Sequence, residues 1–107
     1  MLGLGAVGLS VHAAERKVIA LSLVKGNVRD VADNTVRVKE GDDVELRWTS
    51  DRPVTLHLHG YEIDAQVSPG KPSSMSFKAR FAGRFPVHEH AEGAANHRPV
   101  LYVEVYP

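Results

Sequence analysis

The sequence predicts an all-β fold, a sandwich of two sheets built from about seven to eight short strands. Three observations support this prediction. Apolar and polar residues alternate with a period of two in several short segments. These segments recur at intervals of about ten residues, with turn residues between them. No window of the sequence shows a sustained helical period.

Each predicted strand is defined by its apolar positions. In the third of them, Val44, Leu46 and Trp48 share one face, because alternate residues of a strand point the same way. Turn residues such as those at 40–43 and 69–72 separate the strands. In chain order, we expect strands at residues 17–24, 35–39, 44–48, 54–59 and 73–79, one that starts at residue 85, and one at residues 101–105.

Composition limits both the class of protein and its partners. The chain has 107 residues, the length of one domain. Its 13 basic and 13 acidic residues balance, which predicts no nucleic-acid partner and no general attraction to an anionic membrane surface. The chain contains no cysteine, so disulfides, thiolate catalysis and every thiolate-bound metal site are excluded.

The first residues differ from the rest of the chain. Residues 1–14 are apolar, rich in small side chains and too short to span a bilayer. We interpret them as a signal-peptide remnant; the alternative is a buried N-terminal helix or strand, and the glycines disfavour a stable helix. The domain then covers residues 15–107, and the protein is expected to be periplasmic or secreted rather than an integral membrane protein.

Histidines are the one compositional excess, and five of them are candidate metal ligands. Within each of two pairs, the histidines are two residues apart and therefore project from the same face of a strand. Imidazole suits copper, zinc and nickel. The alternative is that each is an ordinary surface or core histidine, since most histidines bind nothing. The candidates are His57 and His59, His88 and His90, and His97.

Two features near these histidines leave alternatives open. Pro86 lacks an N–H and favours an edge strand or a bulge, so His88 and His90 could face toward His59 or away from it. Nearby acidic residues could be ligands, partners of an imidazole N–H, or solvated loop charges. These acidic residues are Glu62, Asp64, Glu89 and Glu92.

Several motifs, in the right order, resemble those of cupredoxins, in particular the copper domains of cytochrome oxidase subunit II and nitrous oxide reductase. The resemblance covers roughly residues 17–107 and implies a Greek-key β-sandwich. The motifs are VELRW at 44–48, LHGY at 58–61, VSPGK at 67–71, AGRF at 82–85, and the histidine of HR at 97–98.

The resemblance also implies ligand positions and shows where this chain departs from the family. His59 matches the upstream copper ligand and His97 the downstream loop ligand. The family's cysteine would fall near residue 89, between His88 and His90, where this chain has none. A type 1 blue site and a cysteine-bridged binuclear site are therefore excluded, whereas nitrogen and oxygen ligands favour tetragonal Cu(II).

These observations predict an exported protein that binds copper through a cysteine-free, histidine-rich site, for metal handling rather than electron transfer. Zinc is the less favoured ion. The alternative is a metal-free interaction or assembly module that binds a periplasmic or membrane protein. We do not expect an enzyme, because the chain has no nucleophile triad in recognisable context, no phosphate loop and no pair of catalytic carboxylates.

Overall fold

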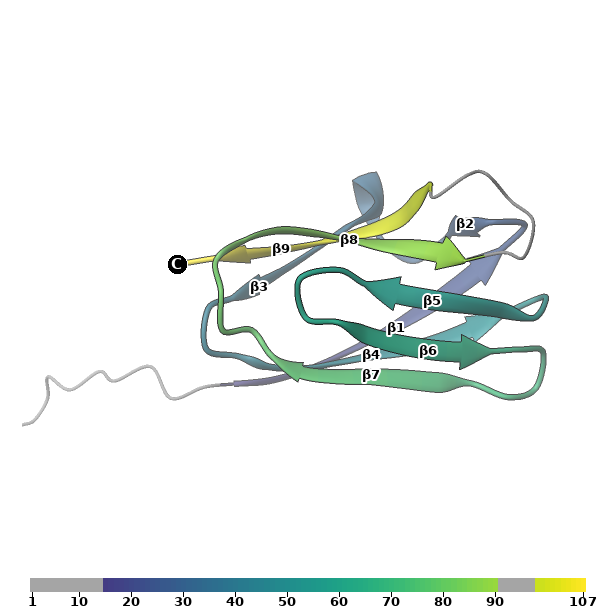
Figure 1. Cartoon of the computed structure of the whole chain (residues 1–107), viewed down its shortest axis with the longest axis horizontal. Helices are drawn as coiled ribbons and strands as arrows, with labels where there is room; N and C mark the ends of the chain where they lie inside the picture. The colour runs from purple at the N-terminus through teal and green to yellow at the C-terminus, as the bar shows by residue number, and fades with distance from the viewer. Residues whose placement is uncertain (1–14, 91–97) are drawn as a thin grey trace, which may run out of the picture.

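The structure is a computed structural model that describes residues 15–90 and 98–107. The predicted signal-peptide segment 1–14 and the predicted ligand His97 lie outside the described residues. The described part of the chain folds into nine strands and one short 3-10 turn, η1 (Figure 1). Their bounds are β1 Arg16–Val24, β2 Asn27–Val28, η1 Ala32–Asn34, β3 Thr35–Lys39, β4 Asp43–Ser50, β5 Val54–Leu58, β6 Ile63–Val67, β7 Ser73–Lys78, β8 Gly83–His90 and β9 Pro99–Tyr106.

Over the described residues, the strands form two sheets packed as a sandwich, as the sequence predicts. One sheet has four strands in the order β2-β1-β4-β7, and the other has five in the order β3-β9-β8-β5-β6. Two pairings are parallel, β1 with β4 and β3 with β9, and the others are antiparallel. Because strands that follow one another in the chain often lie in different sheets, residues far apart in sequence become neighbours.

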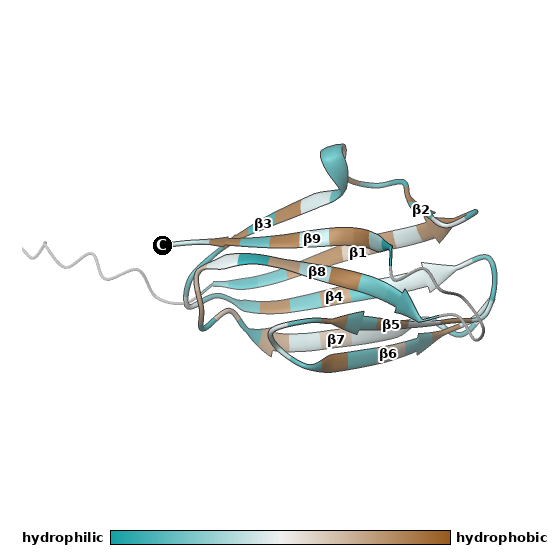
Figure 2. Cartoon of the chain, turned by 45° about the horizontal axis from the view of Figure 1, so that its top comes forward, coloured by the Kyte–Doolittle hydropathy of each residue, from teal (hydrophilic) through white to brown (hydrophobic). Residues whose placement is uncertain are grey.

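The alternation of apolar and polar residues decides which face of each strand is buried. Along β4 and β5 every second side chain is buried and those between are partly or fully exposed. Figure 2 shows the same alternation as hydrophilic and hydrophobic bands along the strands. A sandwich is the natural result, because each sheet has one apolar face that must be covered.

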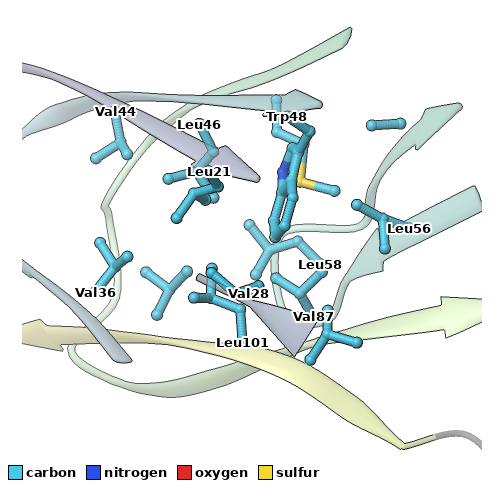
Figure 3. Close-up of a cluster of buried hydrophobic side chains, with 14 of the residues drawn as sticks. Leu21, Val28, Val36, Val44, Leu46, Trp48, Leu56, Leu58, Val87 and Leu101 are labelled. Carbon is cyan, nitrogen blue, oxygen red and sulfur yellow. The ribbon is translucent and has the colours of Figure 1, made fainter. Parts of the chain in front are cut away.

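The hydrophobic core lies between the inner faces of the two sheets. Trp48 of β4 is completely buried and points toward Leu58 and Val87 of the opposite sheet (Figure 3). The buried hydrophobic residues are Leu21, Leu23, Val28, Val36, Val38, Val44, Leu46, Trp48, Val54, Leu56, Leu58, Ala65, Val67, Met75, Ala79, Val87, Val100, Leu101, Val103 and Val105.

Two of the strands were not among those predicted. β6 does alternate, with Ala65 and Val67 buried, but its small alanine makes the apolar period weak. β2 has two residues, too few for any period to be visible, and it pairs with the end of β1 across a tight turn.

Within residues 15–90 and 98–107, no helix is long and apolar enough to cross a membrane.

Candidate metal centre

Outward positions of β5 and β8 carry three of the predicted ligand histidines, and His59 follows directly after β5. In β5 the side chains of Val54, Leu56 and Leu58 are buried, so His57 lies on the opposite, outer face. β8 pairs antiparallel with β5 and places His88 directly opposite His57. Two adjacent inner strands of the five-stranded sheet, β5 and β8, therefore present these histidines on the same outer face.

Pairing between β5 and β8 also decides which way His88 and His90 point. Leu58 lies opposite Val87 and both side chains are buried, so the next residue of β8 faces outward. A bulge interrupts the pairing of β8 with β9 between Val87 and His88, but the pairing with β5 continues through residues 87–90. His88 and His90 therefore share the outer face with His57.

Four imidazole rings gather at this place. The ring centroid of His57 lies 4.5 Å from that of His59 and 5.6 Å from that of His90. The centroid of His88 lies 4.5 Å from that of His59. Four of the five predicted ligands are thus brought together within the described residues.

The turn after β5 begins at His59 because of Pro86. The backbone N–H of His59 donates to the carbonyl of Pro86 at 3.0 Å, but proline has no N–H to donate in return. The ladder between β5 and β8 therefore ends at Leu58, and residues 59–62 are free to form the turn into β6. This turn brings two potential ligands, His59 and Glu62, back toward β5.

Contacts within the turn hold Glu62 in position. One carboxylate oxygen of Glu62 accepts a hydrogen bond from the backbone N–H of Gly60 at 3.1 Å. The other oxygen lies 3.4 Å from Nε2 of His57. The Tyr61 hydroxyl donates to the carbonyl of Phe81 and accepts from its N–H, both at 3.1 Å, which ties the turn to the segment before β8.

His57, His59 and Glu62 form a potential ligand set of two nitrogens and one oxygen. One ligand atom from each lies within 4.8 Å of the other two. Ligands that bind one ion at 2.0–2.1 Å are at most about 4.2 Å apart. The Glu62 side chain is 72% exposed, so it has space to turn toward an ion.

A buried nitrogen of His59 that lacks a hydrogen-bond partner among the described residues indicates whether this set fits a metal ion. Nε2 of His59 is buried and, within the described part of the chain, has no hydrogen-bond partner. Trp48 Nε1 is in the same situation, but an indole N–H is only a donor and cannot bind a cation. An imidazole nitrogen can bind a cation through its lone pair. Burying a polar atom without any partner costs free energy, which a bound ion would offset. The residues present therefore fit a metal ion.

Sequence reasoning named the acidic residues near the histidines without choosing between them. The structure selects Glu62 as a potential ligand and brings Asp64 against His57. Glu89 instead forms an ion pair with Arg52 at 2.6 Å, and Glu92 lies outside the described residues. The position where the family's cysteine would fall is thus held by a carboxylate that is paired with an arginine.

Comparison with known proteins supports the fold rather than a function. No protein-family model and no curated protein matches the chain. Among solved structures, it is similar to a chain of a heme-copper terminal oxidase dimer, with a TM-score of 0.58, 20% identity, and coverage of 92% of this chain and 67% of that one. It is also similar to a multicopper oxidase, with a TM-score of 0.61, 16% identity, and coverage of 83% of this chain and 44% of that one.

The fold is cupredoxin-like. At these identities the likeness establishes the architecture alone, and this domain spans less than half of the multicopper oxidase chain. The cupredoxin-like domain has no cysteine, so what it can bind depends on its own histidines and carboxylates. Its potential site combines imidazoles from β5, β8 and the turn after β5 with the carboxylate of Glu62.

Proposed function

We propose that this cupredoxin-like domain is an exported copper-binding protein that holds Cu(II) through His57, His59 and Glu62. The observation that carries the proposal is the buried, unpartnered Nε2 of His59, in a residue that lies in one cluster with a second imidazole and a carboxylate. Its role is to handle the metal rather than to catalyse a reaction.

Chemistry of the ligand set favours copper and argues against long-range electron transfer. Nitrogen and oxygen ligands suit Cu(II) in a tetragonal arrangement, and a given site of this kind usually binds Cu(II) more tightly than Zn(II). His88, with its ring 4.5 Å from that of His59, supplies a further nitrogen next to the set. A strained thiolate site, which suits rapid electron transfer, is impossible without cysteine.

The test is a titration of the metal-free full chain with Cu(II), followed by calorimetry and by electron paramagnetic resonance. We expect one tetragonal site with nitrogen ligands and a dissociation constant below micromolar. His59→Ala is expected to weaken binding by on the order of 100-fold or more, because it removes a direct ligand. The control, Glu104→Gln, removes a carboxylate that pairs with Arg37 elsewhere in the sheet and is expected to bind copper normally.

Other results would overturn the proposal or part of it. Absence of any site tighter than micromolar would overturn metal binding and favour the alternative, a metal-free module that binds a periplasmic or membrane protein. Tighter binding of Zn(II) than of Cu(II) in a competition titration would overturn the choice of copper.

Export is the other part of the proposal, and it is tested separately. The apolar, small-residue composition of residues 1–14 supports it. Cells that express the full chain are fractionated, and the N-terminus of the recovered protein is determined by mass spectrometry. We expect periplasmic or secreted protein that begins close to residue 15; uncleaved protein in the cytoplasm would overturn export.

A further inference from the structure

Asp64 contacts the ring nitrogen of His57 that does not face Glu62. It lies in β6 directly opposite His57 in β5, and directly opposite residues of a sheet share a face. One oxygen of Asp64 is hydrogen-bonded to Nδ1 of His57. The other ring nitrogen of His57, Nε2, lies 3.4 Å from the carboxylate of Glu62. His57 is therefore held between two carboxylates, each at its own nitrogen.

The chemistry of the two contacts fixes where the proton of neutral His57 must be. An ionised carboxylate only accepts hydrogen bonds, so the contact with Asp64 requires a proton on Nδ1. A neutral imidazole carries one proton, and Nε2 is then left with its lone pair. That lone pair faces the carboxylate of Glu62, which is also an acceptor. Two acceptors this close repel each other unless a proton or a metal ion lies between them.

We propose that Asp64 is a positioning residue, which holds His57 in the Nδ1–H tautomer and aims Nε2 at the ion beside Glu62. This inference rests on the proposed function for the identity of the cation, but the tautomer is a property of the metal-free chain. A carboxylate behind a ligating histidine orients the ring and makes the nitrogen a better ligand. Asp64 does this from the neighbouring strand, without touching the ion.

Loss of Asp64 has two expected consequences. The ring of His57 loses the carboxylate that accepts from Nδ1, so its proton can move to Nε2 and block the nitrogen that faces Glu62. Copper affinity is then expected to fall by about 10- to 100-fold, the usual effect of removing such a partner. The ligands themselves are still present, so the resonance spectrum of bound copper is expected to keep its nitrogen pattern.

The test reads the tautomer directly in the metal-free full chain, labelled with nitrogen-15. Long-range proton–nitrogen spectra at about pH 8.5, above the range in which imidazoles titrate, assign a protonated or an unprotonated shift to each ring nitrogen. In the wild type we expect Nδ1 of His57 to be protonated and Nε2 unprotonated. In Asp64→Ala we expect the two shifts to converge or exchange.

A matched control is Gln66→Ala, which truncates the next outward residue of the same strand, opposite Thr55. It is expected to leave both the tautomer and the copper affinity unchanged, whereas Asp64→Glu is expected to restore part of the affinity that Asp64→Ala loses. A purely structural effect of Asp64 would change the unfolding midpoint without moving the nitrogen shifts, and that result would overturn the proposal.

The outcomes separate this inference from the proposed function. A wild-type chain that binds copper but has the Nε2–H tautomer at His57 would overturn the role of Asp64 alone. A chain with the expected tautomer but no copper site would overturn the proposed function and support the position of the proton. If Asp64→Ala fails to fold, the wild-type spectrum by itself still decides the tautomer.

Discussion

At the scale of single residues, Gly60 determines the shape of the turn that carries His59 and Glu62. Its φ is +92°, in the region that side chains rarely adopt. A Cβ at this position would lie 2.4 Å from Cδ1 and 2.8 Å from Cε1 of Phe85. The Phe85 ring therefore occupies the space that any side chain would need, and it packs edge-on against Tyr61 at 5.0 Å between centroids.

Replacing Gly60 is expected to disturb both stability and the site. Gly60→Ala should lower the free energy of unfolding by about 1–3 kcal/mol, because the methyl group and the Phe85 ring cannot both be accommodated without a shift. Urea unfolding measures this effect. Copper titration of the same variant is expected to show weaker binding, since the turn also holds Glu62.

A substitution at a second glycine, Gly41, separates the effect of the clash with Phe85 from the effect of the strained backbone on stability. Gly41 has a similar φ of +99°, but a Cβ there would meet no heavy atom within 4 Å. Gly41→Ala therefore carries the backbone strain without the clash and is expected to be the milder variant, with unchanged copper binding. Equal loss of stability in both variants would show that Phe85 is not the cause.

At the scale of elements, a charged network joins the outer faces of β1 and β4 and the edge strand β7. Glu45 of β4 pairs with Arg16 of β1 at 2.7 Å and with Arg47 of its own strand at 2.8 Å. Ser74 of β7 donates a hydrogen bond to it at 3.2 Å. The hydrogen bond from Arg47 lowers the pKa of Glu45; desolvation opposes this shift, and the charge of the guanidinium adds to it.

The direction of this shift predicts how the network contributes to stability as the pH changes. A carboxylate whose pKa is lower in the folded state stabilises the fold above its ordinary value of 4.5 and loses this effect as the pH falls through the folded value. We expect Glu45→Gln to unfold at a lower urea concentration than the wild type at pH 7, and at the same concentration in strong acid.

The control for this comparison is Glu40→Gln, which removes an exposed carboxylate in the turn after β3. Its unfolding midpoint is expected to follow that of the wild type more closely across the same pH range. High salt should also reduce the difference between the wild type and Glu45→Gln, because exposed ion pairs are screened. A difference that persists unchanged in acid would contradict the role of the Glu45 charge.

Strand prediction at this scale depended on how regular each element is. β1, β4, β5, β7 and β9 show a clear period of two, and the sequence predicts all of them. β6 was not predicted because Ala65 is a weak apolar signal, although β6 carries Asp64. The element that supplies the partner of His57 was thus one of the two that the sequence did not predict.

At the scale of the whole molecule, the core and the candidate site lie on opposite faces of the same strands. Leu58 and Val87 face the interior, while their neighbours His57 and His88 face outward. The two sheets are held together by the buried apolar side chains, and the ligand histidines His57 and His59 are not among them. The fold is therefore expected not to depend on the metal.

This separation predicts how copper changes the stability of the domain. The metal-free chain should unfold cooperatively, and free copper at 100 times its dissociation constant should add about 2.7 kcal/mol, because it binds the folded state. Circular dichroism during heating, with and without copper, measures the shift. The double variant His57→Ala/His59→Ala should unfold near the wild-type temperature without copper and show no shift with it; a full shift in that variant would place the ion elsewhere.

The sequence by itself determined the fold class and the placement of His57 on the strand face opposite to Leu56 and Leu58. Both depend on a period of two, which is a local property of an extended backbone. The tertiary structure alone decided that the histidines of β5 and β8 face each other, and that Glu62 and Asp64 flank His57. These contacts depend on register between strands and on the turn at Gly60; a one-residue slip of β8 against β5 would have moved His88 and His90 to the other face.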